Sequence, residues 1–189
     1  MSGKLIMIAA PSGCGKTTIA KAILANHPDL LFSVSATTRP QRSNEIEGRD
    51  HFFLTKELFD QHLHQGNLAE WEEIYGNYYG TLKSEIQRAL QQGRTMLFDI
   101  DVKGALSIRN HFPKESILIF IKPPNIEVLK KRLENRNTEN SEMLKRRLER
   151  VPMEMEQGEK FDVQVINDDL QKAIDEVDAV VIKNLKKDH

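Results

Sequence analysis

The chain carries, at residues 10–17, the stretch Ala10-Pro11-Ser12-Gly13-Cys14-Gly15-Lys16-Thr17. An apolar run at residues 5–9 precedes it, and a pattern typical of a helix follows at residues 19–24. A strand, a glycine-rich loop and a helix in this order form the context that a phosphate-binding loop requires. The glycines let backbone N–H groups turn toward phosphate oxygens, and the start of the helix adds unpaired N–H groups. The stretch therefore predicts a site for a nucleoside triphosphate.

Individual side chains of this loop carry further predictions. Lys16 is expected to reach the β- and γ-phosphates as a mobile cation, and the Thr17 hydroxyl to bind Mg²⁺. Ala10 stands where the motif usually has its first glycine, a departure that backbone at negative φ tolerates. Cys14 precedes a helix N-terminus, which can lower a thiol pKa, but a small residue that fills the loop is the favoured interpretation. The alternative for the whole stretch is an ordinary glycine-rich turn with a surface lysine, which the flanking strand and helix disfavour.

The bulk composition indicates one globular α/β domain. The chain has 189 residues, of which 39% are hydrophobic and 29% charged, and its formal net charge is −1. This balance argues against general attraction to nucleic acid or to an acidic membrane. The apolar start leads directly into the loop, so it is not interpreted as a signal peptide, and no run approaches transmembrane length. A single cysteine excludes an internal disulfide and favours a cytoplasmic protein.

Strands and helices are predicted to alternate along most of the chain. Beyond the first strand, the predicted strands are 30–35, 51–54, 68–75, 95–101, 116–121 and 161–166. Six further helices are predicted after the first. Three have predicted ranges: from 81 or 83 to 92, 102–110 and 141–157. The other three are predicted from their starts, at the caps Thr55 and Asn125 and at residues 167–169. The segments 36–50, 76–80 and 136–140 are predicted as a loop, a turn and a loop. The alternation predicts a three-layer α/β/α fold with a parallel central sheet, which a small mixed α+β lobe at 36–82 interrupts.

Three residues in the 36–82 segment indicate how a second ligand could bind. Arg39 and Arg42 lie three apart in a polar loop, where two guanidinium groups can converge on one phosphate. From spacing alone, solvated surface arginines are the favoured alternative. Glu70 lies beside Trp71 in an apolar strand pattern, and a carboxylate there can accept hydrogen bonds from guanine N1–H and the 2-amino group. Adenine presents an acceptor at N1, so the same carboxylate would reject it. For Glu70 taken alone, a surface acid on a strand edge is again the favoured alternative.

Taken together, these motifs resemble the guanylate kinases in order and spacing, over about residues 4–182. The segments that carry the resemblance are the phosphate loop, 35–42 (SATTRPQR), 70–71 (EW), 76–81 (GNYYGT), 99–104 (DIDVKG), 123–124 (PP) and 165–169 (VINDD). The resemblance implies the reaction ATP + GMP ⇌ ADP + GDP with Mg²⁺, and dGMP as an alternate acceptor. It implies a P-loop core at 1–35 and 83–189, a GMP-binding lobe at 36–82, and a short helical lid at about 136–147.

The resemblance also implies which residues form the site. The ATP-binding residues are Ala10, Pro11, Ser12, Gly13, Cys14, Gly15, Lys16, Thr17, Thr18 and Asn167, the last of these close to the adenosine. The GMP-binding residues are Ser35, Arg39, Arg42, His51, Glu70, Tyr79, Thr81 and Asp99. The residues near Mg²⁺ are Thr17, Asp99 and Asp101. The catalytic residues are Lys16, Arg39, Arg136 and Arg147, of which the last two arrive with the lid. Within the GMP set, Arg39, Arg42 and Tyr79 hold the phosphate, Glu70 recognises the guanine edge, and Ser35 and Thr81 contact the base.

His51 departs from the family pattern, which usually has tyrosine after Arg49-Asp50. A histidine can donate to the GMP phosphate from a ring nitrogen, more strongly when protonated, or it can leave this contact to Tyr79. If His51 makes the contact, GMP affinity should rise as the pH falls from 8 to 6.

The sequence leaves two alternatives to a GMP kinase. Another P-loop nucleoside monophosphate kinase is disfavoured by Glu70 and by the pair Tyr78-Tyr79. A non-catalytic guanylate-kinase-like module that binds proteins is disfavoured because Gly15, Lys16 and Thr17 are all present. The expected partners are ATP and GMP, without nucleic acid or membrane, for a chain that is a monomer or a homodimer. The basic residues at 130–132, 146 and 150 are interpreted as solvated helix faces.

Overall fold

The computed structural model describes residues 3–74, 76–134 and 141–185, without the side chains of residues 141–144 and 146. The predicted loop at 136–140, and with it Arg136, lies outside the described residues. Within the described ranges, no helix is long and apolar enough to span a membrane.

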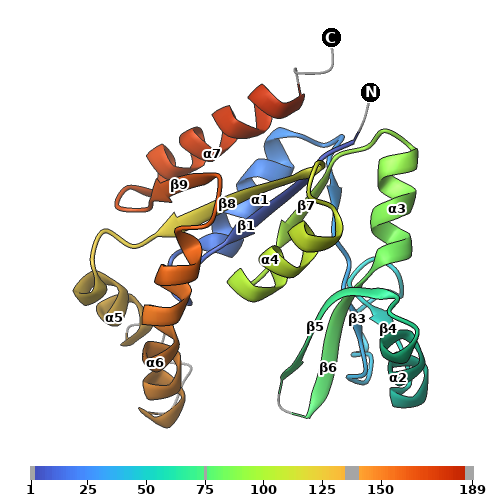
Figure 1. Cartoon of the computed structure of the whole chain (residues 1–189). Coiled ribbons are helices and arrows are strands. Elements are labelled where there is room, and N and C mark those ends of the chain that lie inside the picture. Colours follow the sequence, from blue (N-terminus) through green and yellow to red (C-terminus); the bar gives the residue numbers. More distant parts are fainter. Residues whose placement is uncertain (1–2, 75, 135–140, 186–189) are drawn as a thin grey trace.

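A five-stranded parallel sheet forms the centre of the molecule, in the order β2-β7-β1-β8-β9 (Figure 1). Its strands are β1 (Leu5–Ala9), β2 (Leu31–Phe32), β7 (Met96–Asp99), β8 (Ser116–Lys122) and β9 (Val163–Ile166). Every residue of β1 is buried, as expected for a central strand that helices cover on both faces. The predicted parallel sheet is confirmed.

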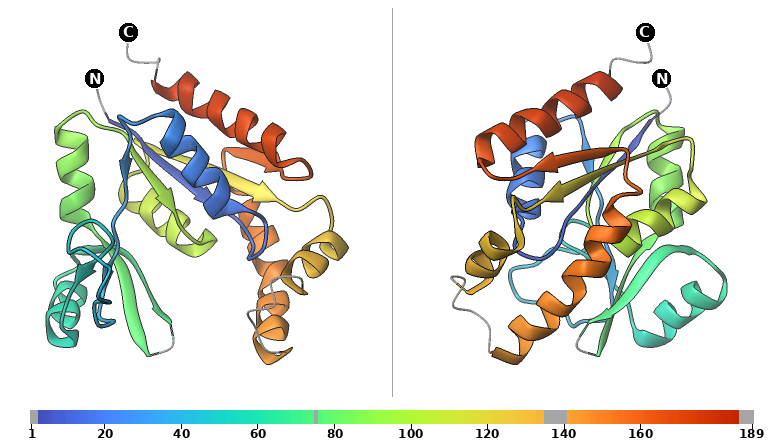
Figure 2. Two further views of the ribbon diagram at one scale, coloured as in Figure 1. Left: turned by 180° about the vertical axis from the view of Figure 1, so that it is seen from behind. Right: turned by 60° about the vertical axis from the view of Figure 1, so that its left-hand side comes forward.

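Helices cover the two faces of this sheet. The first face is covered by α1 (Lys16–Asn26) and α7 (Leu170–Leu185), which pack against each other. The opposite face is covered by α4 (Val102–His111) and α3 (Lys83–Gln91). At one end of the sheet, α5 (Ile126–Glu134) and α6 (Ser141–Gly158) lie together, and both views of Figure 2 show α6 extending away from the strands.

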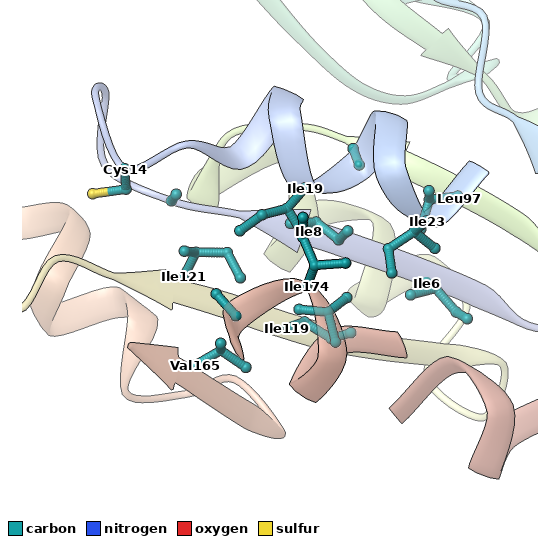
Figure 3. Packing of buried hydrophobic residues seen from close by; sticks show 14 of the residues in the cluster. Ile6, Ile8, Cys14, Ile19, Ile23, Leu97, Ile119, Ile121, Val165 and Ile174 are labelled. Atoms are coloured by element: carbon teal, nitrogen blue, oxygen red, sulfur yellow. The ribbon is translucent and has the colours of Figure 1, made fainter. Parts of the chain in front are cut away.

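Alternation along β1 divides the core into two apolar clusters. Ile6 and Ile8 point toward α1 and α7, and Figure 3 shows them against Ile19 and Ile23 of α1. Leu5, Met7 and Ala9 instead pack with α3 and α4. Each fully buried side chain of this size contributes about 1.5–3 kcal/mol. Because successive side chains of a strand point to opposite faces, β1 alone contributes to the apolar clusters on both faces of the sheet.

The segment between residues 36 and 82 forms a sheet of its own, in the order β4-β3-β6-β5. Its strands are β3 (Ala36–Thr37), β4 (Phe52–Phe53), β5 (Leu68–Ile74) and β6 (Asn77–Leu82), and α2 (Lys56–His64) belongs to the same segment. The pair β3–β4 is parallel and the other pairs are antiparallel, so the sheet is mixed. A separate small cluster around Phe59 holds this part together. The predicted mixed sheet is confirmed, whereas its movement as a separate lobe stays a prediction.

Three sequence predictions in this region are wrong in detail. The predicted strand 30–35 is only Leu31–Phe32 in the central sheet, and the predicted loop from residue 36 begins with β3 in the second sheet. The predicted turn at 76–80 is wrong because β6 begins at Asn77. Gly80 lies inside that strand. A larger residue would not fit there, because a Cβ would lie 2.8 Å from the Glu70 carbonyl oxygen. Gly80 therefore permits close backbone approach within a strand, whereas the sequence predicts it in a turn.

The predicted helix starts are confirmed by their caps. The Thr55 hydroxyl accepts from the Leu58 N–H at 3.2 Å, and the Asn125 side chain accepts from the Val128 N–H at 2.8 Å. Asp169 accepts from the Lys172 N–H at 2.9 Å at the start of α7. These local hydrogen bonds fix where the helices begin, and therefore which residues stand at the edge of the sheet.

Candidate active site

The phosphate loop leaves the carboxyl end of β1, between β7 and β8, where open parallel sheets bind their ligands. Gly13 and Gly15 have φ angles of 92° and 83°, a left-handed conformation that favours glycine. Gly15 is the N-cap of α1 and offers no side-chain cap, so the first helical N–H groups remain available to an anion. The loop therefore has the backbone of an anion cradle.

Cys14 is a packing residue of this loop. Its side chain is buried, and Figure 3 shows it at the edge of the α1 cluster. Burial raises the pKa of the Cys14 thiol to about 12, although the positive charge of Arg132 opposes the shift. The thiol therefore stays protonated at physiological pH, which bears out its interpretation as a loop filler. Ala10 is buried in the same cluster, where its methyl group is accommodated.

The Asn167 side chain supports the phosphate loop through a hydrogen bond to the loop backbone. Its Nδ2 donates to the Cys14 carbonyl at 2.8 Å, and a Cβ on Gly15 would lie 2.5 Å from the same nitrogen. Its own carbonyl accepts from Arg132 Nη1 at 2.9 Å. The interpretation of Arg132 as part of a solvated face is therefore wrong. The predicted contact of Asn167 with adenosine stays a prediction, and its hold on the loop is a finding that the sequence did not provide.

Lys16 lies against the carboxyl end of β7. Its Nζ donates to the Ile100 carbonyl at 2.8 Å and lies 2.9 Å from Asp99 Oδ1. Parallel pairing of β1 with β7 sets Asp99 opposite Ile8, and this register brings the acid next to the loop. The structure thus places together the predicted phosphate-binding lysine and one predicted acidic residue.

The second predicted acid, Asp101, is already engaged at both oxygens. Its Oδ1 accepts from the Gly104 N–H at 2.7 Å and so caps α4. Its Oδ2 lies 3.5 Å from Arg150 Nη2. Asp101 therefore links the start of α4 to α6.

α6 brings two arginines to the same side of the site, three residues apart and hence on one helix face. Arg147 Nη1 donates to the Ser12 hydroxyl at 2.5 Å, which joins the predicted lid arginine to the phosphate loop. Arg150 lies by Glu154, a residue that is only 8% exposed. Burial raises the pKa of Glu154, while the charge of Arg150 opposes the shift. The Arg150 side chain is 45% exposed, which agrees with the prediction of a solvated helix face, but its guanidinium also lies close to carboxylates of other elements.

These residues line a cavity of about 610 Å³. The phosphate loop forms one wall, α6 contributes Arg147, Arg150 and Glu154, and the β5 strand of the second sheet contributes residues 72–74. A second cavity of about 600 Å³ contains Glu70 in its lining. The two cavities share Glu72, Glu73 and Asp101, so they lie side by side. Glu70 thus lies in a cavity that adjoins the one at the phosphate loop, whereas Arg39, Arg42 and Tyr79 are not in the lining of either cavity.

Glu70 is held by Thr81 across the β5–β6 ladder. The Thr81 hydroxyl donates to Glu70 Oε1 at 2.6 Å, and Thr81 itself is buried. The pKa of the Glu70 carboxyl is raised to about 7, first by burial and against the Thr81 hydrogen bond. The negative charges of Asp101 and Glu72 contribute less to this rise. Two of the three residues predicted to contact the base are thus in direct contact.

Arg39 is oriented by a residue that the sequence did not reveal as important, Glu45. The Arg39 guanidinium donates to both Glu45 oxygens, at 3.0 and 2.7 Å, and Tyr79 also interacts with it. Glu45 Oε2 accepts from the Arg42 N–H at 2.8 Å as well. The side-chain hydrogen bond from Arg39 lowers the pKa of Glu45 to about 2. One carboxylate therefore fixes the loop that carries both predicted phosphate-binding arginines.

His51 lies within the predicted GMP-binding set. Its Nδ1 lies 2.9 Å from the Ser35 hydroxyl, and its ring meets the Tyr79 ring edge-on with centroids 6.0 Å apart. His51 therefore connects Ser35, predicted to contact the base, with Tyr79, predicted to contact the phosphate. The described residues hold no group of three or more histidine, cysteine, aspartate or glutamate side chains that could bind a metal ion by themselves.

Comparison with known proteins agrees with this geometry. The sequence profile described as guanylate kinase matches residues 2–184. A guanylate kinase of Chlorobium chlorochromatii is 47% identical over 181 residues, which cover 96% of this chain and 95% of that protein. One from Chlorobium luteolum is 45% identical, with 93% and 89% covered. The crystal structure of guanylate kinase from Anaplasma phagocytophilum has a TM-score of 0.74 at 28% identity, covering 99% of this chain and 88% of that one.

Proposed function

This chain belongs to the guanylate kinase family and is an ATP:GMP phosphotransferase, and we propose how its residues divide the transfer of the γ-phosphoryl group between them. The observation that carries the assignment of roles is the pair of adjoining cavities. One contains the phosphate loop and the other contains Glu70, so donor and acceptor can meet between them. In-line transfer needs this proximity more than it needs covalent assistance.

The donor is bound by the phosphate loop. The N–H groups around Gly13 and Gly15 surround its phosphates, and the Thr18 N–H belongs to the same helix start. Lys16 exchanges its contacts with Asp99 and Ile100 for the β- and γ-phosphates. Arg147, already beside Ser12, adds positive charge to the transferred group.

Mg²⁺ is the metal that fits the donor atoms of this site. Thr17 offers a hydroxyl oxygen and Asp99 a carboxylate oxygen, both hard ligands of the kind Mg²⁺ prefers. Mg²⁺ commonly takes only one or two protein ligands and completes its shell with phosphates and water. Asp101, whose oxygens contact the Gly104 N–H and Arg150, would act on the ion only through water. When bound, the ion neutralises charge that develops on the phosphates.

The acceptor is bound by the second sheet and its loop. Arg39, Arg42 and Tyr79 hold the GMP phosphate, with His51 beside them, and Asp99 lies near the same group. Glu70 accepts from the guanine N1–H and 2-amino group, while Thr81 and Ser35 complete the contacts to the base. Because Glu70 is buried, an adenine ring would leave it facing another acceptor, which is costly.

The transfer itself requires no general base, because a GMP phosphate oxygen is already anionic at neutral pH. It requires exclusion of water, since an open site would let water accept the phosphoryl group. We propose that the segment 36–82 and the lid at about 136–147 close over the two nucleotides, and that Arg136 and Arg147 act in the closed state. The Glu70 contact favours guanine and leaves the sugar open, which is consistent with dGMP as a second acceptor.

A matrix of substrates tests this assignment. ATP or GTP is offered as donor against GMP, dGMP, AMP, UMP and IMP as acceptor, with Mg²⁺ or with EDTA, and ADP release is followed. We expect ATP with GMP to be the best pair, dGMP to be accepted and AMP to be poor. Equal turnover of AMP and GMP would overturn the role of Glu70. ADP release that does not depend on GMP would overturn the transferase assignment in favour of a binding module.

A further inference from the structure

Arg150 on α6 lies among three carboxylates that come from different parts of the fold. Its Nη1 is 3.4 Å from Glu72 Oε1 on β5, and its Nη2 is 3.5 Å from Asp101 Oδ2 ahead of α4. Its Nε is 3.6 Å from Glu154 Oε1 on α6 itself. In Figure 1 the second sheet and α6 extend as two arms from the central sheet, and the contact between Arg150 and Glu72 joins these arms.

Glu72 stands on the same side of β5 as Glu70. Glu70 pairs with Thr81 and Glu72 with Tyr79 on the neighbouring strand, and Trp71 between them points to the opposite side. A change in the charge or position of Glu72 therefore acts directly beside the residue proposed to recognise guanine.

Negative charge predominates around Glu70. The titratable and charged groups there are Glu72 and Glu73 on β5, Tyr79 on β6, Asp101, Lys103 and His111 at and along α4, and Arg150 and Glu154 on α6. Arg150 contacts both carboxylates that raise the pKa of Glu70, namely Asp101 and Glu72. Removing this guanidinium would leave their charges uncompensated.

We propose that Arg150 is a positioning residue for guanine recognition. By binding Glu72 and Asp101 it offsets their negative charge and holds β5 in place, and thereby keeps the Glu70 carboxylate ionised and directed at the base. This inference rests on the proposed role of Glu70. It gives α6 a part in choosing the acceptor base, in addition to the phosphate contacts of Arg147.

The protonation state of Glu70 decides which purine it matches. The ionised carboxylate offers two acceptors and fits the two donors of guanine. The protonated carboxyl offers one donor and one acceptor, and so fits adenine N1 and the 6-amino group. The GMP complex should therefore favour the ionised carboxylate and the AMP complex the protonated one, so selectivity for GMP over AMP should fall as the pH drops through the range in which Glu70 titrates in these complexes.

The experiment measures the dissociation constants of GMP and AMP by calorimetry between pH 5.5 and 8.5. The ratio of the two constants removes the titration of the phosphate, whose second pKa of about 6 is common to both ligands. It also removes any effect of His51 on the phosphate. The variants are Arg150→Gln, Arg150→Lys, Glu72→Gln and the double variant Arg150→Gln/Glu72→Gln. Lys160→Gln, at an exposed position after α6, controls for the loss of one positive charge.

We expect the midpoint of the selectivity profile to rise by about half a pH unit or more in Arg150→Gln, because a nearby positive charge is lost. Glu72→Gln should shift the midpoint in the opposite direction. The double variant should return close to the wild type, Arg150→Lys should retain most of the effect, and Lys160→Gln should leave the profile unchanged.

Other outcomes would overturn the proposal. If Arg150→Gln lowers kcat without shifting the profile, Arg150 acts on the phosphoryl group in the closed state instead. If Arg150→Gln does not fold, the proposal still fails unless Glu72→Gln lowers the midpoint. A wild type without selectivity for GMP would refute the role of Glu70 itself, whereas a selective wild type with an unshifted variant refutes only the role of Arg150.

Discussion

Arg39 and Glu45 form a two-pronged ion pair, in which the guanidinium donates to Glu45 Oε2 at 3.0 Å and to Oε1 at 2.7 Å. The same carboxylate accepts from the Arg42 N–H at 2.8 Å. A carboxylate in this position offers the guanidinium a pair of oxygens, as two of the oxygens of a phosphate would. In the ligand-free protein, Glu45 thus holds the loop that carries Arg39 and Arg42 in a conformation suited to binding an anion.

Replacing Glu45 by Gln should weaken GMP binding. Glutamine keeps the shape but can accept only one of the two hydrogen bonds from Arg39, and it loses the charge. We expect KM for GMP to rise about tenfold with KM for ATP and kcat changed less than about twofold, because the loss concerns acceptor binding. Steady-state kinetics with each nucleotide varied in turn measures this. Glu57→Gln on α2 is the matched control, and an equal loss for both nucleotides would contradict the prediction.

Replacing Glu70 by Gln should abolish the choice between purines. The amide offers one acceptor and one donor at all pH values, so it no longer matches guanine and gains a match to adenine. We expect kcat/KM for GMP to fall by about two orders of magnitude, while the affinity for ATP is retained. Acceptor kinetics with GMP and AMP, together with ATP binding, measures this. Retained preference for GMP in Glu70→Gln would remove Glu70 from base recognition.

The same substitution should stabilise the ligand-free protein at high pH. The pKa of Glu70 is about 7 in the folded state, above the ordinary value of 4.5, so the folded state binds more protons than the unfolded state between these values. Glu70 therefore makes stability fall as the pH rises from about 4.5 to about 7, and the loss is complete above that range. Glu70→Gln should recover at most about 3 kcal/mol at pH 8 and little at pH 4.5.

Thermal unfolding of both proteins at pH 4.5, 6 and 8 checks the sign of this effect. A midpoint difference that grows from pH 4.5 to pH 8 supports the buried, charged Glu70. A variant that is less stable at every pH would show instead that the ionised carboxylate stabilises the ligand-free fold.

Replacing Lys16 by Met should stop the reaction while leaving the acceptor site intact. The charge of Lys16 is proposed to act on the transferring group, so its loss raises the barrier and not the GMP dissociation constant. We expect kcat to fall by about two to three orders of magnitude or more. Rapid-quench kinetics together with calorimetric binding of GMP separates the two effects, with Lys21→Met on the exposed side of α1 as control. A kcat within tenfold of the wild type would contradict the role of Lys16.

Much of the fold follows from local patterns, and less of the site does. The apolar run at β1 and the caps at Thr55 and Asn125 were sufficient to place strands and helices. Gly80 misled because the sequence does not distinguish a glycine needed for a turn from one needed for close packing. The phosphate loop is contiguous and was predictable. By contrast, Arg150 is 78 residues from its partner Glu72, and only the folded chain brings such residues together.

Asn167 illustrates the same limit and leads to a separate prediction. Its side chain is expected to contact adenosine, but in the structure it donates to the Cys14 carbonyl at 2.8 Å and is 4% exposed. In Asn167→Ala the carbonyl loses its buried partner, which costs about 1–3 kcal/mol of stability, and the phosphate loop loses its support. We therefore expect a lower unfolding temperature and a higher KM for every nucleoside triphosphate donor, with KM for GMP little changed. Thermal unfolding and donor kinetics with ATP and GTP measure this, and Asp168→Ala beside it is the control. If Asn167 acts only on adenosine, the variant will unfold at the wild-type temperature and lose affinity for ATP but not for GTP.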